Sequence, residues 1–369
     1  MTDQSIPFTA LVQGLPATVP FVGPEAIERR RGRTFKARIG ANESAFGVSP
    51  KAAAAMREAV GRVSWYGDPE SFELRQALAA KHGVAMEEIC VGGGIDELLG
   101  LVVRMTVTPE TPVVTSLGAY PTFNYHVAGF GGRLVAVPYV EDREDPESLL
   151  AAVKTEGAPL VYLANPDNPM GTWQDAAAVS DFIAALPQGC LLVLDEAYIE
   201  FAPEGLAPPI DTDDPRVVRM RTFSKAHGMA GARIGYAIAH RDVITGLNKI
   251  RNHFGLNRIA QAGALASLGD PAFVAQVAAQ VEAGRQDTYA LAERLGLAAL
   301  PSATNFVAID VGSGERARAI LQGLQEEEVF IRMPGVAPLD RCIRVSIGRP
   351  EERALFATAL EKVLAAVPV

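Results

Sequence analysis

Residues 190–198 read CLLVLDEAY, and residues 217–228 read VVRMRTFSKAHG. Each stretch begins as a short apolar run and then turns polar, which is typical of a buried strand of a parallel sheet followed by a loop. In open α/β sheets, ligands bind outside the carboxyl ends of the strands. Asp195 and Lys225, which follow the two runs, are therefore expected to belong to one binding site.

The same alternation of apolar runs and longer amphipathic stretches extends from about Ser49 to Ala239. It predicts an α/β fold with a mostly parallel central sheet flanked by helices. The expected strands are EICV (88–91), PVVTS (112–116), RLVAVPYV (133–140), PLVYLAN (159–165), CLLVLD (190–195), VVRMRTFS (217–224) and IGYAIA (234–239). Helices are expected over 95–105, 145–157 and 174–187.

Beyond Arg241 the pattern changes to helical runs up to 250, over 257–268 and over 271–295, with strands over 304–311, 329–332 and 342–348. A helix near 315–328 and a closing helix from Pro350 complete the chain. This order of helices and strands predicts a smaller α+β domain. The expected division is an N-terminal segment (1–48) that packs with the small domain, a large domain (49–255) and a small C-terminal domain (256–369).

Composition narrows the class of partner. The chain has 369 residues, a net charge of −9 and a pI near 5.2, which argues against a nucleic-acid surface. The N-terminus lacks a signal peptide pattern, and no apolar stretch is long enough to span a bilayer. Cys90, Cys190 and Cys342 are expected to be reduced packing residues of a cytoplasmic protein, and the five histidines have no metal-ligand spacing. Small-molecule partners are therefore expected.

Three glycines, Gly92 to Gly94, separate the run EICV from a helix. Such a loop can point backbone N–H groups at a phosphate, and the helix N-terminus adds a favourable dipole. A plain tight turn between strand and helix is an equally open interpretation.

Asp195 and Lys225 each have two interpretations. A carboxylate at the end of a buried strand needs a cation or donor, such as a protonated pyridine nitrogen, unless it caps the next helix. A lysine amine can form an imine with an aldehyde, although a lone lysine is more often a solvated cation. The neighbouring Ser224 and Arg233 favour the functional interpretation, because they could bind the same phosphate as the glycine loop.

In order along the chain stand ANESAFG, GGGIDE, NPDNPMGT, DEAYIEF, RTFSKAHGMAGARIGY, TNF and RVSIGRPEE. This ordered set resembles the fold-type-I aminotransferases that use pyridoxal 5'-phosphate (PLP), and within them the histidinol-phosphate aminotransferase family. The resemblance covers nearly the whole chain. It implies the aspartate-aminotransferase-like fold, a PLP-dependent transaminase and a homodimer with shared active sites.

The resemblance also implies a role for each matching residue. Lys225 would bind the cofactor aldehyde as a Schiff base and then move the proton, and Asp195 would pair with the pyridine nitrogen. Asn168 and Tyr198 would bind the phenolic oxygen, and Tyr120 would stack on the ring, although both tyrosines could be packing residues. The cofactor phosphate would be held by Gly94, Ile95, Asp96, Thr222, Ser224 and Arg233, with Tyr66 reaching the neighbouring subunit's phosphate.

The substrate-binding residues implied by the resemblance are Arg344 for the α-carboxylate, Asn42 beside it, Arg332 as a second anion-binding residue and Phe21. A sheet-edge salt bridge, a turn residue and a solvated strand end are the respective alternatives for the first three. The chain departs from the family at three kinds of position. Gly93 and Ile95 replace the usual Asn and Ser of the glycine loop, Phe21 lacks the hydroxyl of a common Tyr, and Met170 replaces Thr.

The leading hypothesis is a transaminase that moves an amino group from histidinol phosphate, or an aromatic amino acid, to a 2-oxo acid such as 2-oxoglutarate. A PLP-dependent decarboxylase of the threonine-phosphate type is the alternative that keeps the cofactor. A non-catalytic PLP-binding regulator is the remote one.

Overall fold

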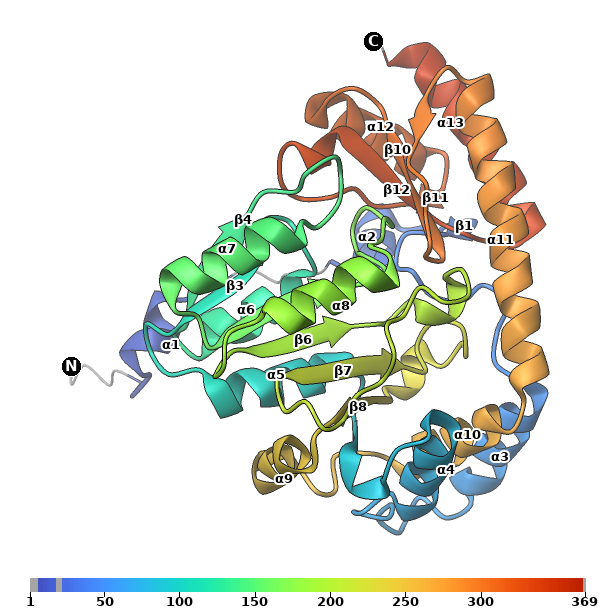
Figure 1. Cartoon of the computed structure of the whole chain (residues 1–369). Coiled ribbons are helices and arrows are strands. Elements are labelled where there is room, and N and C mark those ends of the chain that lie inside the picture. The colour runs from blue at the N-terminus through green and yellow to red at the C-terminus, as the bar shows by residue number, and fades with distance from the viewer. Residues whose placement is uncertain (1–5, 18–21, 368–369) are drawn as a thin grey trace, which may run out of the picture.

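The computed structural model describes residues 6–17 and 22–367 (Figure 1). Its centre is a seven-stranded sheet in the order β2-β8-β7-β6-β5-β3-β4. The strands are β2 (Ile89–Gly92), β3 (Pro112–Ser116), β4 (Arg133–Val137), β5 (Leu160–Ala164), β6 (Leu191–Asp195), β7 (Val217–Thr222) and β8 (Gly235–Ala239). All neighbours are parallel except β8, which is antiparallel to both β2 and β7. The mostly parallel sheet is thus confirmed, and each of its strands overlaps a predicted one.

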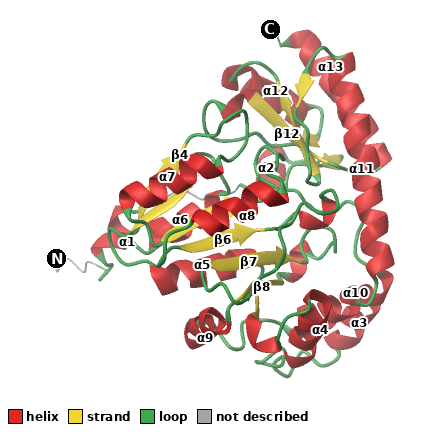
Figure 2. Cartoon of the chain, viewed as in Figure 1, coloured by secondary structure: helices red, strands yellow, loops and turns green. Residues whose placement is uncertain are grey.

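Helices cover both faces of this sheet (Figure 2). On one face lie α5 (Ile95–Thr106), α6 (Pro121–Gly129) and α9 (Arg241–Ile250), and on the other lie α7 (Pro146–Glu156) and α8 (Ala176–Ala185). Strand β5 contributes Leu160 and Tyr162 to the first core and Val161 and Leu163 to the second. Because both faces are buried, the strand is a continuous apolar run rather than an alternating one.

A third core lies beside β2 and β8, where α3 (Pro50–Val60), α4 (Phe72–His82) and α10 (Arg258–Leu268) pack together. Helix α10 lies within the predicted small domain by sequence, yet it packs against α3. The domain boundaries drawn from the sequence stay a prediction.

The rest of the chain forms a second α/β region around its own apolar core, above the large sheet in Figure 1. Its strands are β9 (Ala298–Ala299), β10 (Phe306–Asp310) and β12 (Cys342–Ser346), which form an antiparallel sheet, and β1 (Ala37–Arg38) and β11 (Val329–Phe330), which pair in parallel. Its helices are α2 (Pro24–Arg31), α11 (Pro271–Arg294), α12 (Gly314–Glu326) and α13 (Pro350–Ala366); α1 (Ala10–Gly14) lies apart. Strand β1 therefore attaches the N-terminal segment to this region.

Short 3-10 helices complete the described elements: η1 (Met86–Glu88), η2 (Ile199–Phe201), η3 (Ala230–Ala232) and η4 (Leu339–Arg341). Within residues 6–17 and 22–367, no helix combines the length and apolar character needed to cross a bilayer. The three cysteines are buried and free, as predicted.

The turn after β7 is held by a close backbone approach. Gly228 has a φ of +71°, and a Cβ built on it would lie 1.8 Å from the carbonyl oxygen of Gly47. Such a contact would force the backbone to shift, so this position requires glycine. The turn carries Lys225, and its shape therefore depends on Gly228.

We predict that Gly228→Ala destabilises the protein far more than Gly205→Ala. Both glycines have positive φ, but nothing lies within 4 Å of a Cβ at Gly205. Both variants suffer the backbone penalty of about 1–2 kcal/mol, and only Gly228→Ala adds overpacking of about 1–3 kcal/mol. Thermal unfolding of both variants measures the difference, and equal melting temperatures would contradict the prediction.

Candidate active site

Residues predicted for the site lie at the ends of four strands that run in the same direction, at one edge of the large sheet. Gly92 ends β2 and Gly93 and Gly94 follow it, Asn165 to Met170 follow β5, Asp195 ends β6, and Ser224 and Lys225 follow β7. Because β8 runs in the opposite direction, its start lies at this edge, and Arg233 just before it lies there too. The sequence-predicted residues therefore converge.

Asp195 is a buried carboxylate, 5% exposed. The hydroxyl of Tyr162 donates to Oδ2 at 2.8 Å, and the backbone N–H of Ala197 donates to Oδ1 at 3.0 Å. Burial is the largest influence on this carboxyl and raises its pKa to about 6, while the nearby Lys225 charge acts in the opposite direction. Among the described residues Asp195 forms no ion pair, so its charge is only partly compensated.

The turn that carries Asp195 is fastened to β7 by a buried ion triad. Glu196, 1% exposed, binds Arg219 Nη2 at 2.8 Å and Arg221 Nε at 2.8 Å. Both arginines lie on β7, Arg221 four residues and Arg219 six residues before Lys225. Burying these charges is tolerable because each has a hydrogen-bonded partner. The triad fixes the end of β6 relative to the strand that leads to Lys225.

Lys225 points to Asn42, a residue of the N-terminal segment. Its Nζ donates to the Asn42 carbonyl oxygen at 3.1 Å and lies 5.4 Å from the centre of the Tyr198 ring. The Asn42 side chain donates from Nδ2 to the Tyr198 hydroxyl at 3.0 Å and accepts from Ser346 Oγ at 3.0 Å. Asn42 is 3% exposed and forms hydrogen bonds through its carbonyl oxygen and both polar atoms of its side chain.

The glycine loop and Arg233 lie against each other. Gly94 has a φ of +88°, and a Cβ built there would lie 2.5 Å from Arg233 Nη2. Arg233 also binds Asp96 Oδ2 at 3.2 Å, and its Nη1 donates to Ser224 Oγ at 3.5 Å. Helix α5 begins at Ile95, directly after this loop, and no side chain caps it, so the N–H groups of its first turn are left for a ligand. This arrangement suits a bound phosphate.

Two further predicted residues border this group. Thr222 Oγ1 donates to Ser224 Oγ at 2.9 Å and accepts from the Ser224 backbone N–H at 3.0 Å, so it orients the serine. The Tyr120 hydroxyl donates to Asp96 Oδ1 at 2.8 Å. Burial raises the pKa of Tyr120 above its ordinary value, which keeps the phenol protonated.

Arg344 supplies a guanidinium that no carboxylate of the described residues neutralises. It donates to Asn168 Oδ1, it lies 5.1 Å from the Phe306 ring centre, and its Nε is buried without a hydrogen bond. Burial lowers the pKa of Arg344 to about 10. The alternative of a sheet-edge salt bridge therefore does not hold. An anion bound here would compensate a buried charge.

Arg332 lies beside Arg344, since the two residues pair as an isolated antiparallel bridge. Its Nη2 donates to the Val22 carbonyl oxygen at 2.9 Å, and burial lowers its pKa. It is therefore a partly buried residue near the N-terminal segment rather than a solvated strand end. Phe21, the predicted substrate contact next to Val22, lies outside the described residues.

Tyr66 stands apart from the rest. Its side chain is 76% exposed, and its ring packs at 4.8 Å on Phe254. Other large apolar side chains that are near Tyr66 in sequence, or in contact with it, are exposed too: Val60, Val63, Trp65, Phe72 and Phe254. Within one chain, the Tyr66 side chain faces solvent and does not join the group formed by Gly94, Ser224 and Arg233.

Several residues with clear roles in the geometry were not among the predicted ones. Tyr162, the donor to Asp195, is one phenol within an apolar strand, and only the pairing of β5 with β6 brings it there. Asn305, within the quoted TNF motif, donates to the carbonyl oxygens of Asn42 at 3.1 Å and Glu43 at 3.3 Å. Its place in that motif was the available signal.

A pair of buried acids supports the Asn165–Met170 turn. Asp167 accepts from the Tyr139 hydroxyl at 2.8 Å and the Met170 N–H at 3.0 Å, and Glu144 accepts from Ser116 Oγ at 2.7 Å. Burial raises the pKa of Asp167 to about 6 and that of Glu144 well above its usual range. The described residues contain no cluster of three or more His, Cys, Asp or Glu placed to hold a metal.

Comparison with known proteins adds to this geometry. The family model "Aminotransferase class I and II" matches residues 36–360. The chain is 34% identical to histidinol-phosphate aminotransferase 2 of Carboxydothermus hydrogenoformans, over 96% of this chain and 98% of that protein. It is 37% identical to histidinol-phosphate aminotransferase of Anaeromyxobacter sp., with the same two coverages. A crystal structure of the Sinorhizobium meliloti histidinol-phosphate aminotransferase in complex with pyridoxal-5'-phosphate superposes with a TM-score of 0.96, at 53% identity and 100% coverage of both chains.

The burial of Asp195 generates a pH prediction for the cofactor-free protein. Its native pKa of about 6 exceeds the ordinary 3.8, so the native state binds this proton more tightly than the unfolded chain does. The carboxyl's contribution to stability is therefore greatest below about pH 4 and declines as the pH rises towards about 6. Asp195→Asn removes this decline. The melting temperature of the variant minus that of the wild type should increase from pH 4 to pH 7.

Asp181→Asn is the control, because Asp181 is exposed on α8. Its melting temperature should differ from that of the wild type by an amount that does not depend on pH in this way. A difference for Asp195→Asn that stays flat across the same range would contradict the assignment of a raised pKa.

Proposed function

This chain belongs to the class I and II aminotransferases, and from that premise we propose that it moves the amino group of histidinol phosphate to a 2-oxo acid such as 2-oxoglutarate. The chain is a PLP-dependent transaminase, and its substrates are small molecules. The choice of donor is supported by the likeness to named histidinol-phosphate aminotransferases along the whole chain. The observation that carries the chemistry is the meeting of Lys225 with the buried, incompletely neutralised Asp195 at one sheet edge.

The residues at this edge fit PLP. Asp195 has no ion-pair partner among the described residues. The ring nitrogen of PLP, when protonated, would be such a cation. Because Gly94 has no Cβ, the glycine loop can lie close to Arg233. Ser224 and the first turn of α5 lie beside them. These groups together offer a guanidinium, a hydroxyl and backbone N–H donors, as a phosphate requires. The cofactor's aldehyde would be bound by Lys225.

The hydrogen bonds already made by Asn168 and Tyr198 support their proposed role at the phenolic oxygen of the cofactor. Arginine only donates, so the Asn168 oxygen faces Arg344 and its Nδ2 group is directed elsewhere as a donor. The Tyr198 hydroxyl accepts from Asn42 Nδ2, which leaves its own proton for donation. Both residues could therefore donate to one anionic oxygen. Tyr120, held by Asp96, is proposed to stack on the ring.

The reaction requires a proton to leave the carbon that carries the substrate's amino group. PLP, when bound, withdraws electrons from that carbon. The Lys225 amine is proposed to take this proton and later return one, since it lies between the Asn42 carbonyl and the Tyr198 ring. Asp195 would keep its charge next to the pyridine nitrogen, held in place by Tyr162 and Ala197.

Substrate anions are proposed to bind Arg344, Arg332 and Asn42. Arg344 is the main candidate for a carboxylate, because its guanidinium is buried without an ion pair among the described residues. A bidentate fork suits a carboxylate or a phosphate. Arg332, paired by backbone with Arg344, would supply a second charge for the same or the opposite end of a substrate.

We further propose a homodimer in the cytoplasm. The exposed apolar group around Tyr66 supports the dimer, because large exposed apolar patches mark interfaces. In such a dimer Tyr66 would reach the phosphate site of the neighbouring subunit. The free buried cysteines support a reducing compartment.

The experiment that tests the function is a panel of donors supplied with 2-oxoglutarate, scored for glutamate and for carbon dioxide. We expect glutamate from histidinol phosphate, with a higher kcat/KM than from aromatic amino acids. No glutamate from any donor would overturn transamination. Carbon dioxide released from threonine phosphate without glutamate would favour the decarboxylase instead.

Lys225→Ala should abolish both transamination and the absorbance of the bound cofactor near the visible edge. The reason is that the variant lacks the amine that binds the aldehyde. Lys154→Ala, an exposed lysine on α7, is the matched control and should retain both properties. A Lys225→Ala protein that keeps the wild-type spectrum would refute the proposed role of this lysine.

Arg344→Gln should raise the KM for 2-oxoglutarate by about 10- to 100-fold, since hydrogen bonds to charged groups contribute roughly 1.5–3 kcal/mol. The kcat should change less, because the lost interaction is made in both the bound and the reacting state. Arg318→Gln, an exposed arginine paired with Asp340, is the control and should leave KM unchanged. An unchanged KM in Arg344→Gln would show that the acceptor binds elsewhere.

A further inference from the structure

Arg285 is a buried arginine that lies outside the residues assigned to the cofactor or substrate. It is 6% exposed and projects from α11, the long helix that runs along one side of the molecule in Figure 1. Its charge is balanced by Glu282, one turn earlier on the same helix, which binds both Nε and Nη2. The pair is therefore neutral overall, which makes its burial tolerable.

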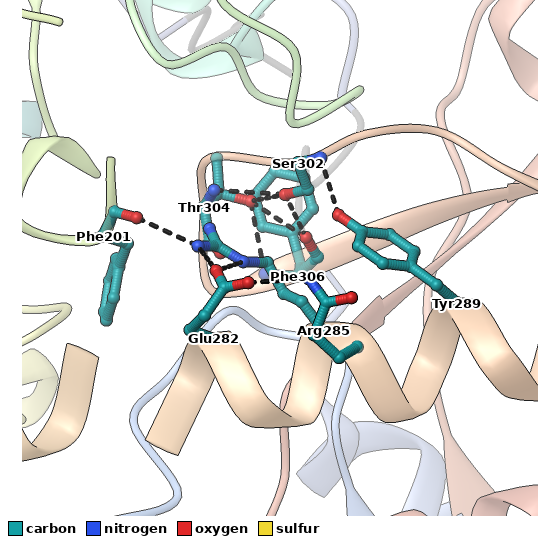
Figure 3. A network of polar contacts seen from close by, with 8 residues as sticks. Phe201, Glu282, Arg285, Tyr289, Ser302, Thr304 and Phe306 are labelled. Carbon is teal, nitrogen blue, oxygen red and sulfur yellow. Dashed lines mark hydrogen bonds and ion pairs between the residues drawn. The ribbon is translucent and has the colours of Figure 1, made fainter. Parts of the chain in front are cut away.

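The guanidinium bridges two segments that are far apart in sequence. Nη1 donates to the carbonyl oxygen of Thr304 at 3.1 Å, and Nη2 donates to the carbonyl oxygen of Phe201 at 3.2 Å. Figure 3 shows the side chain between these two carbonyls. One segment follows β6 of the large sheet, and the other leads into β10 of the second region. Arg285 thus joins the two regions of the fold.

Each carbonyl belongs to a turn that carries a residue of the candidate site. Phe201 ends η2, which begins directly after Tyr198, and the Phe201 N–H donates to the Tyr198 carbonyl oxygen at 2.9 Å. Thr304 directly precedes Asn305, whose amide donates to the Asn42 carbonyl oxygen at 3.1 Å. Moving either carbonyl would therefore move a side chain that contacts Asn42.

Both segments that Arg285 holds carry a residue that contacts Asn42. Its carbonyl accepts from Asn305 and also from Lys225 Nζ at 3.1 Å, and its side chain donates to the Tyr198 hydroxyl at 3.0 Å. The position of the Lys225 amine relative to Tyr198 is consequently set through two turns that Arg285 holds.

Helix α11 contacts the turn that contains Thr304 through a second residue. Tyr289, one turn after Arg285, accepts from the Ser302 N–H through its hydroxyl at 2.8 Å. Ser302 Oγ in turn donates to the Phe306 carbonyl oxygen at 2.6 Å, which closes the 302–306 turn (Figure 3). On its other side this turn meets the Asn165–Met170 turn, because the Ala303 N–H donates to the Gly171 carbonyl oxygen at 2.8 Å.

We propose that Arg285 is a positioning residue for the transamination reaction: it fixes the spacing of the Tyr198 and Asn305 turns and so aligns the Lys225 amine. It contacts neither cofactor nor substrate residues directly. The inference rests on the proposed role of Lys225. An arginine is required because its planar fork reaches two carbonyls and one carboxylate at once, whereas a lysine ammonium has a single centre.

The test compares Arg285→Gln and Arg285→Lys with two controls. Arg294→Gln changes an exposed arginine on the same helix, which is paired with Glu361 at 2.6 Å. Glu282→Gln removes the counter-charge and should lower the melting temperature, but it leaves both carbonyl bonds of Arg285 in place, so it is compared in kcat and absorbance pKa only. All variants are assayed well below their melting temperatures, so that a loss of fold is not mistaken for a loss of alignment.

We expect Arg285→Gln to lower kcat by about tenfold or more, since small misplacements of reacting groups are costly, while KM changes by less than about threefold. The apparent pKa of the bound cofactor's absorbance should shift, because the environment of the Lys225 nitrogen changes. Arg285→Lys should restore part of both losses. Arg294→Gln should resemble the wild type in all readouts, and Glu282→Gln should keep the wild-type kcat and absorbance pKa.

Hydrogen exchange of the cofactor-free protein gives a readout independent of activity. Arg285→Gln should speed exchange in residues 198–202 and 302–306, and Arg294→Gln should not. Both this measurement and the absorbance titration are independent of the amino donor, so they test the inference even if histidinol phosphate is not the substrate. If Arg285→Gln matches Arg294→Gln in kcat, absorbance pKa and exchange, Arg285 is a purely structural residue and the proposal is overturned.

Discussion

A carboxylate buried without a full counter-charge governs the organisation of this protein. Asp195 lies at the end of a central strand, and the fold gives it one phenol, one backbone N–H and the charge of Lys225. Taking such a group out of water costs several kcal/mol unless a cation lies beside it. The surrounding structure keeps the carboxylate in place through the Glu196 ion triad. In the function proposed here, this carboxylate would receive the cationic ring nitrogen of the cofactor.

The second constraint is that the site is shared between two regions with separate apolar cores. Lys225 and Asp195 belong to the large sheet, Arg344 and Asn305 belong to the second region, and Asn42 connects them. Apolar residues from loops of the large sheet, Tyr198, Phe201 and Ala226, pack in the core of the second region. The hydrogen bonds of Asn42 add to this packing and fix the positions of individual polar groups. The alignment of catalytic groups is thus sensitive to residues such as Arg285 that contact no ligand.

Much of the architecture could be predicted from the sequence. Strands β5 and β6 are buried on both faces, so their apolar runs were clear, and α11 was marked by its length. Helix α6 (PTFNYHVAG) was not predicted, because only Phe123 and Val127 are buried and they leave a weak periodic signal. Strand β1 is two residues long and exists only through its pairing with β11. Its position required the tertiary structure.

For the site, sequence predicted the residues at strand ends but not those that depend on register. Tyr162 reaches Asp195 because Tyr162 pairs with Val193, two residues before Asp195, so both side chains lie on the same face of the sheet. No spacing in the sequence encodes that register. Tyr66 and the domain boundaries stay predictions, since one chain tests neither.

The convergence on Asn42 also has a consequence for biosynthesis. The hydrogen bonds that meet there join residues separated by 183, 263 and 304 positions along the chain. Contacts of such long range form late, and they cannot form on the ribosome until the C-terminal strand has emerged. A nascent chain that already contains Lys225 therefore lacks its finished surroundings. If Lys225 binds the cofactor as proposed, productive capture would wait for the last part of the polypeptide.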